Sequence, residues 1–282
     1  MFIKSLSGLN ALVLGATRGI GKDIALALAQ EGANIILPYY DWPTDCQKTI
    51  EHFGTLPGRH LTVKTDLRNP AQIKELCQKI EIEYKHLDIL INNIERGGMP
   101  IVHGPYTPEQ WDLEMDTTLK AKWWVFQTAL PLLQKARQGV VVNLSSIAGE
   151  IGRAGPAAMI FNDAYAAANR AVSSFTETWA RQAAPVRVNE LILGFIEGRH
   201  AQGTRGWELL DENTRQKITD RTLLKRTGRL AEVTKAVLFL IKDAPFMTGS
   251  SIRLDGGFCL GHDRVPTMPK GEDNLEVVVA DS

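Results

Sequence analysis

Residues 11–30, ALVLGATRGIGKDIALALAQ, constrain the fold more than any other stretch of the chain. A short apolar run leads into a glycine-rich turn, and the turn leads into small and aliphatic residues with helical spacing. Gly15 lets the backbone turn off a strand, Gly19 lets it approach a ligand closely, and Gly21 permits close packing of helix on strand. Such a helix presents unpaired N–H groups and a positive dipole end. The turn therefore predicts a site for the pyrophosphate of a dinucleotide.

Strand and helix patterns alternate along the rest of the sequence, with no internal repeat. The strand patterns cover residues 11–14, 34–37, 60–64, 87–91, 139–144, 187–193 and 251–254. The helical patterns cover residues 20–31, 45–53, 70–84, 108–135, 164–184 and 230–242. Most strands are short and apolar, as expected where helices cover both faces of a sheet. This order predicts an α/β protein with a three-layer αβα Rossmann fold, whose seven-stranded parallel sheet is doubly wound and carries ligand groups at the strand ends.

Composition excludes several classes of partner. The chain has 282 residues, with 32 Lys plus Arg against 32 Asp plus Glu. This balance provides no basic field for nucleic acid, and no segment approaches the roughly 20 apolar residues that span a bilayer. We therefore expect no nucleic-acid partner, no membrane partner and a cytoplasmic location. The three cysteines are isolated and the six histidines are scattered, so we expect no metal site.

Several motifs resemble those of the short-chain dehydrogenase/reductase family. LGATRGIG is similar to the family's T-G-x-x-x-G-I-G, and NLSSIAG at residues 143–149 is similar to N-x-S-S-x-A-G. The resemblance covers residues 6–258, and R-G-I-G with G-F-I-E is most similar to the 3-oxoacyl-[acyl carrier protein] reductase branch. It implies one dinucleotide-binding and catalytic domain, residues 1–258, and a C-terminal extension, residues 259–282. It also implies a homo-oligomer, a dimer or a tetramer.

The resemblance further implies a nicotinamide cofactor bound along the strand ends. The positions that match its cofactor-binding residues are Gly15, Thr17, Arg18, Gly19, Ile20, Gly21, Asp66, Leu67, Asn92, Tyr165, Asn169 and Ile196. Arg18 is the residue type that pairs with a 2′-phosphate through a charge-assisted fork. Pro38 and Tyr39, rather than an acidic residue, occupy the positions at the end of the second strand. NADP(H) is therefore favoured, and NAD(H) remains open.

The same resemblance assigns catalysis to four residues. Ser146 matches the hydroxyl that polarises a substrate carbonyl, and Tyr165 matches the residue that exchanges a proton with the substrate oxygen. Thr118 stands at the family's Asn, which holds a water of the proton relay. Asn169 replaces the Lys of Y-x-x-x-K, and a six-residue insertion at about residues 153–162 precedes the motif. Tyr165 and Asn169 are four apart and would share a helix face, but an amide cannot stabilise a phenolate as an ammonium does.

Other departures from the family fall around the same site. Ile94 and Glu95 replace the Ala-Gly of N-N-A-G, where small residues let the cofactor pass. Residues 200–221 occupy the place of the family's mobile substrate lid. Lys122, one turn beyond Thr118, could reach inward as a substitute for the missing Lys, but we favour a solvated or interfacial position for it.

Two functional hypotheses follow from these observations. The leading one is an NAD(P)(H)-dependent oxidoreductase that transfers hydride between nicotinamide and a carbonyl or secondary alcohol. The alternative is a catalytically weak or inactive homologue that acts as a nucleotide-binding sensor or a structural subunit, because the replacements cluster at one site. A different reaction, such as a dehydration, is a third option.

Overall fold

The computed structural model describes residues 5–94, 107–197 and 210–261. Its strands are β1 (Asn10–Val13), β2 (Asn34–Tyr39), β3 (Leu61–Lys64), β4 (Ile89–Asn92), β5 (Val140–Ser146), β6 (Arg187–Leu193) and β7 (Ser251–Leu254). Its α-helices are α1 (Gly19–Gln30), α2 (Pro43–Thr55), α3 (Pro70–Tyr84), α4 (Pro108–Glu114), α5 (Ala121–Leu133), α6 (Ala148–Ile151), α7 (Asp163–Ala183), α9 (Glu212–Arg221) and α10 (Leu230–Lys242). A π-helix, η1 (Met115–Lys120), and two 3₁₀ turns, η2 (Gly155–Met159) and η3 (Phe258–Leu260), complete the described elements.

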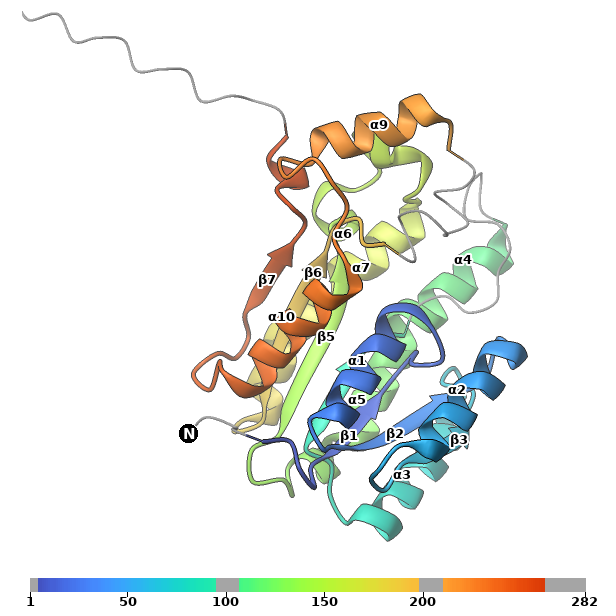
Figure 1. The fold of residues 1–282 in the computed structure, drawn as a ribbon, viewed down its shortest axis with the longest axis vertical. Coiled ribbons are helices and arrows are strands. Elements are labelled where there is room, and N and C mark those ends of the chain that lie inside the picture. The colour runs from blue at the N-terminus through green and yellow to red at the C-terminus, as the bar shows by residue number, and fades with distance from the viewer. Residues whose placement is uncertain (1–4, 95–106, 198–209, 262–282) are drawn as a thin grey trace, which may run out of the picture.

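The strands form one parallel sheet in the order β3-β2-β1-β4-β5-β6-β7 (Figure 1). β1 pairs with β2 on one side and with β4 on the other, so the chain reverses its direction of winding between β1 and β4. The predicted doubly wound, seven-stranded parallel sheet is therefore confirmed. In such a sheet, ligands bind where the strand order reverses, beyond the carboxyl ends of the strands.

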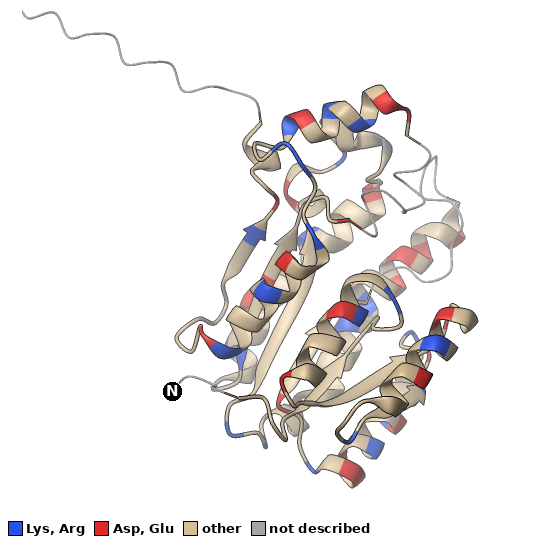
Figure 2. Cartoon of the chain, in the orientation of Figure 1, with Lys and Arg blue, Asp and Glu red and all other residues tan. Residues whose placement is uncertain are grey.

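Helices cover both faces of the sheet and bury it. One core cluster packs α1 and α10 on the sheet, and a second packs α3, α5 and α7 on the opposite face. β5 is buried along its whole length, which explains why it opens on three consecutive valines rather than on an alternating pattern. Acidic and basic residues are interspersed along the outer helices, and few lie on the strands (Figure 2).

A third cluster lies at the carboxyl ends of β5 and β6. It packs α6, η2, the start of α7, α9 and η3 together, with the Phe161 ring stacked on Phe195 at a centroid distance of 5.4 Å and Phe258 against Phe195 at 5.0 Å. The residues of the expected insertion thus form ordered structure, because η2 and the turn into α7 lie in this cluster. Phe258 is fully buried, so the end of the expected catalytic domain is part of the core.

The helix expected over residues 108–135 is interrupted. The structure divides it into α4, the π-helix η1 and α5, and α5 ends at Leu133. A π-helix closes i→i+5 hydrogen bonds and has wider turns than an α-helix, so it changes which of the following residues share the buried face. Hydrophobic periodicity could not show this change, because both kinds of turn leave apolar residues on the buried face.

Candidate active site

The glycine-rich turn has the geometry that its sequence predicts. Gly15 and Gly19 adopt positive φ angles of +66° and +55°, which favour glycine. A Cβ on Gly21 would lie 2.3 Å from the carbonyl oxygen of Gly15, whereas a Cβ on Gly19 would meet no atom within 4 Å. Gly21 therefore allows α1 to pack closely, and Gly19 faces open space.

The N-terminus of α1 is suited to an anion. Its N-cap residue, Arg18, makes no side-chain hydrogen bond to the first N–H groups of the helix. These N–H groups and the space at Gly19 fit a pyrophosphate. Thr17, in the same turn, is buried, and its carbonyl oxygen accepts a hydrogen bond from Thr49 Oγ1 at 2.8 Å.

Two arginines lie near the ends of β2 and β3, where an adenosine would bind. The Arg18 guanidinium lies 4.0 Å from the centroid of the Trp42 ring and 3.9 Å from the Asp45 carboxylate. Arg68 donates to both carboxylate oxygens of Asp66, at 2.8 Å and 2.7 Å. This hydrogen-bonded pair lowers the pKa of Asp66 below its ordinary value. Leu67, beside them, is buried in the core.

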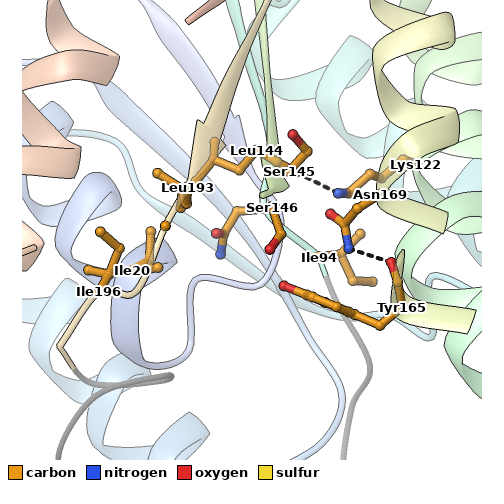
Figure 3. A pocket seen from close by; sticks show the side chains of 12 residues that line it. Ile20, Ile94, Lys122, Leu144, Ser145, Ser146, Tyr165, Asn169, Leu193 and Ile196 are labelled. Atoms are coloured by element: carbon orange, nitrogen blue, oxygen red, sulfur yellow. Dashed lines mark hydrogen bonds between the residues drawn. The ribbon is translucent and has the colours of Figure 1, made fainter. Parts of the chain in front are cut away.

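A pocket lies at the carboxyl ends of β5 and β6, on the side of α7 (Figure 3). Its lining residues are Ile20, Asn93, Ile94, Lys122, Leu144, Ser145, Ser146, Tyr165, Asn169, Leu193, Gly194 and Ile196. It brings together five of the predicted site residues, from α1, β5, α7 and the segment after β6: Ile20, Ser146, Tyr165, Asn169 and Ile196. These five residues, from both the expected cofactor-binding set and the expected catalytic set, thus line one cavity.

Local hydrogen bonds set the positions of Ser146 and Tyr165. Ser146 ends β5, and its Oγ accepts a hydrogen bond from the Ala148 N–H at 3.1 Å. Asn162 caps α7, because its Oδ1 accepts from the Tyr165 N–H at 2.9 Å. The segment of the expected insertion therefore ends at the N-cap of α7, which leaves Tyr165 in the first turn of the helix.

Asn169 lies one turn beyond Tyr165 and is turned back toward it. Its Nδ2 donates to the Tyr165 carbonyl oxygen at 2.9 Å, shown as a dashed line in Figure 3. Asn169 is 3% exposed and lines the pocket together with the Tyr165 ring. At the position that the resemblance matches to the family's Lys, the structure thus has an uncharged amide beside Tyr165.

Two other predicted residues are buried outside the pocket lining. Thr118 is fully buried, and its hydroxyl donates to Glu114 Oε1 at 2.5 Å. Asn92 is fully buried at the end of β4, and its Nδ2 donates to Asn143 Oδ1 at 2.8 Å. The next residue, Asn93, lines the pocket and donates to the Gly15 carbonyl oxygen at 3.3 Å. The strand pairing decides which of the two asparagines faces the cavity.

Lys122 is buried, so the favoured solvated or interfacial position was wrong. It is 2% exposed, and its Nζ donates to the Leu144 carbonyl oxygen at 2.7 Å. Sequence reasoning assumed that a Lys on a helix places its ammonium in water. The spacing of Glu114, Thr118 and Lys122, each four residues apart, was the signal that could have placed Lys122 on the inner face.

Sequence reasoning also missed a buried carboxylate behind the pocket. Glu190, on β6, is fully buried and accepts hydrogen bonds from Ser145 at 2.5 Å, Ser173 at 3.0 Å and Ser251 at 2.5 Å. These serines lie on β5, α7 and β7, so one side chain connects four elements. The cluster holds Ser145, which precedes Ser146, in place.

Some expectations lie outside the described residues. These are Glu95, residues 200–209 of the expected lid at residues 200–221, and residues 262–282 of the C-terminal extension. Within the described ranges, no helix is long and apolar enough to cross a membrane. The same ranges contain no group of three or more His, Cys, Asp or Glu side chains that could hold a metal ion.

Comparison with known proteins gives consistent matches over most of the chain. Residues 15–259 match the family model described as Enoyl-(Acyl carrier protein) reductase. The 3-oxoacyl-[acyl-carrier-protein] reductase FabG of Thermotoga maritima is 33% identical over 260 residues, which cover 90% of this chain and 99% of that protein. The protein of the same name from Vibrio cholerae is 32% identical over 258 residues, which cover 90% of this chain and 98% of that protein.

Solved structures support the same assignment. A Sinorhizobium meliloti protein assigned as a short-chain alcohol dehydrogenase has a TM-score of 0.78 and 26% identity, covering 92% of this chain and 99% of that one. Ligand-free aldohexose dehydrogenase of Thermoplasma acidophilum has a TM-score of 0.73, with 95% and 100% coverage, and its 24% identity supports the fold alone. From its sequence matches, its sheet and its pocket, the chain belongs to the short-chain dehydrogenase/reductase family of oxidoreductases and is similar to 3-oxoacyl-[acyl-carrier-protein] reductases.

Proposed function

We propose that this protein is an NADP(H)-dependent oxidoreductase that transfers hydride between nicotinamide and a carbonyl or secondary alcohol. The observation that carries the proposal is one shared cavity. Ser146 and Tyr165, the expected catalytic residues, line the same pocket as Ile20 and Ile196, the residues expected beside the cofactor. Family membership alone does not establish catalysis, because a protein can share the fold of an enzyme family without its activity.

The residues present fit a dinucleotide. Gly15, Gly19 and Gly21 shape the turn, and the uncapped N–H groups of α1 would bind the pyrophosphate. The half-exposed Arg18 side chain would bind a 2′-phosphate, which favours NADP(H) over NAD(H). Asp66 would contact the adenine while its carboxylate accepts a hydrogen bond from Arg68.

The protein residues supply the proton chemistry. The cofactor, when bound, supplies or accepts the hydride. In the reducing direction, the Ser146 hydroxyl donates a hydrogen bond to the substrate carbonyl oxygen, and the Tyr165 phenol transfers its proton to that oxygen. Both side chains are less than 10% exposed, so bulk water does not compete for the oxygen. General acid catalysis of this kind contributes a factor of roughly 10²–10⁴ in rate.

The pocket favours substrates with an apolar portion. Ile94, Leu144 and Leu193 line it beside the polar residues. The relatives from Thermotoga maritima and Vibrio cholerae are both named 3-oxoacyl-[acyl-carrier-protein] reductases. A 3-oxoacyl thioester is therefore the first substrate class to test.

We also propose a homo-oligomer, a dimer or tetramer, in the cytoplasm. Large apolar side chains remain exposed on α4 and α5 at Trp111 and Trp123, and on and after α10 at Phe239 and Phe246. Association of these faces between copies of the chain would remove these side chains from water. Light scattering of the purified protein would measure its mass, and a monomer at micromolar concentration would contradict this proposal.

The catalytic proposal can be tested with two variants. We expect the wild type to oxidise NADPH with 3-oxoacyl thioesters or ketones, and Tyr165→Phe to lose roughly 10²–10⁴ in kcat. Ser146→Ala should lose less, because Tyr165 remains as the acid. NADPH affinity, measured by Trp fluorescence, should change little in Ser146→Ala. Turnover that survives Tyr165→Phe unchanged would refute the assigned roles.

One observation favours the alternative of a sensor or structural subunit. The side chain at the family's Lys position is an uncharged amide, and Asn169 donates to its own helix at the Tyr165 carbonyl. Tight NADPH binding without turnover on any carbonyl substrate would support this alternative over the enzyme.

A further inference from the structure

The pocket is lined by a lysine that does not come from the family's motif. Among the described residues that line it, Lys122 is the one Lys or Arg. It comes from α5, whereas the family's Lys would come from α7 at the position of Asn169. Figure 3 shows the Lys122 ammonium and the Asn169 amide projecting toward the same cavity from these two helices.

The burial of Lys122 is specific to its position. Lys120, two residues earlier, has a side chain that is 61% exposed and pairs with Asp116 at 3.1 Å. Lys122 is 2% exposed, and its Nζ donates to the carbonyl oxygen of Leu144, two residues before Ser146. Removing an ammonium from water costs several kcal/mol. A buried Lys beside catalytic residues is therefore a candidate for a functional role.

A carboxylate lies on the same buried face of the helix. Glu114 is 1% exposed and accepts a hydrogen bond from Thr118 Oγ1 at 2.5 Å. Glu114, Thr118 and Lys122 follow one another at intervals of four residues, through the π-helix η1. Side chains of a helix lean toward its N-terminus, so Lys122 extends back over the turn of Thr118. This face carries an acid, a hydroxyl and a base where most helices bury apolar residues.

We propose that Lys122 is the positioning residue that replaces the missing Lys of the Tyr165 motif, with Glu114 and Thr118 as its supporting partners. The proposal rests on the proposed function. When the Tyr165 phenol transfers its proton to the substrate oxygen, the Lys122 ammonium stabilises the phenolate that is left. A proton from water then restores the phenol. In this protein the cation comes from α5, whereas in the family it comes from α7, and both side chains act in the same cavity.

Other titratable groups lie on the elements around this site, and their effects must be kept separate from that of Lys122. Two of them are buried, Glu114 on α4 and Glu190 on β6. The others lie on elements that pack around the pocket but do not line it: Glu150 on α6, paired with Arg253, and Asp163 and Arg170 on α7. Asp163 and Arg170 are exposed, and Glu190 is held by its three serines. These groups are unchanged in a Lys122 variant, so a shift seen in that variant reports Lys122.

The test combines removal of the charge with its return at the family's position. Lys122→Met removes the ammonium and keeps the length of the side chain. Lys122→Met with Asn169→Lys restores a cation from α7. Lys120→Met is the matched control, since it removes an exposed Lys from the same helix. Lys122→Gln keeps a donor for the Leu144 carbonyl without the charge, and it serves if Lys122→Met fails to fold.

The first readout needs neither cofactor nor turnover. The phenolate of Tyr165 is followed by ultraviolet absorbance as pH rises, and the titration of Tyr165→Phe is subtracted to isolate it. A cation nearby lowers a phenol pKa, so Lys122→Met should raise the pKa of Tyr165 by about one unit or more, and the double variant should reverse the shift. Lys120→Met should leave it unchanged. The second readout is alcohol oxidation, whose rise with pH should move upward by the same amount.

The outcomes separate this inference from the proposed function. A Tyr165 titration and a pH–rate profile unchanged in folded Lys122→Met or Lys122→Gln would overturn the inference and leave Lys122 a structural tie to Leu144. Loss of turnover in Lys122→Met that Asn169→Lys restores would support it. If no substrate is turned over by the wild type, the proposed function fails, but the Tyr165 titration still decides whether Lys122 acts on the phenol.

Discussion

Replacing Gly21 with Ala tests how closely the dinucleotide cradle is packed. The new Cβ would lie 2.3 Å from the Gly15 carbonyl oxygen and 2.5 Å from Asn93 Nδ2. Ordinary contacts begin near 3.4 Å. Since the closest atom belongs to the backbone, α1 must move away from the turn by about 1 Å, and overpacking of this kind costs about 1–3 kcal/mol.

The displacement should affect folding and binding together. For a chain of this size, that cost corresponds to a fall in Tm of about 2–12 °C. The N–H groups of α1 would also move relative to the pyrophosphate, so NADPH affinity should fall by an order of magnitude or more. Urea unfolding followed by Trp fluorescence and NADPH titration of the same samples would measure both effects.

Gly54→Ala is the matched control. Gly54 lies in α2 with a helical φ, and its new Cβ would meet no atom within 4 Å. The replacement should stabilise the protein by up to about 1 kcal/mol through helix propensity and leave NADPH binding unchanged. If Gly21→Ala behaved like Gly54→Ala in both assays, the described packing of α1 on the turn would be refuted.

Two further predictions concern the adenosine end of the site. Arg18→Gln should weaken NADPH binding by about 10–100-fold and NADH binding by less than about threefold, because only the 2′-phosphate is lost as a partner; equal losses in fluorescence titrations would exclude this role. Asp66→Asn should lower the unfolding free energy by no more than about 1 kcal/mol at pH 7, since the pair with Arg68 is partly exposed. Folding lowers the pKa of Asp66 from 3.8, so the difference in unfolding free energy between wild type and Asp66→Asn is complete above about pH 5 and disappears as pH falls through the lowered pKa. A difference that persisted at about pH 2 would contradict the assignment to the ion pair.

Local patterns in the sequence were sufficient for the architecture. The glycine turn, the short apolar strands and the helical spacing predicted the parallel sheet. Each of these three patterns is formed by residues that are close in the sequence, so it can be recognised without the tertiary structure. The same is true of the placement of Ser146 at a strand end and of Tyr165 at a helix start. Their motifs resembled those of the family closely enough to place both in one pocket, although the six extra residues before Tyr165 offered no local guide to their own conformation.

The tertiary structure decided where the charges of the site lie. Whether Lys122 points to water or to the cavity depends on which face of α5 packs on the sheet, and the π-helix before it alters that face. The three hydroxyl partners of Glu190 come from elements that are distant in sequence, so no local pattern could reveal them. The sequence by itself determined the fold and the identity of the expected catalytic pair; long-range packing determined that Lys122 lines the same pocket as that pair.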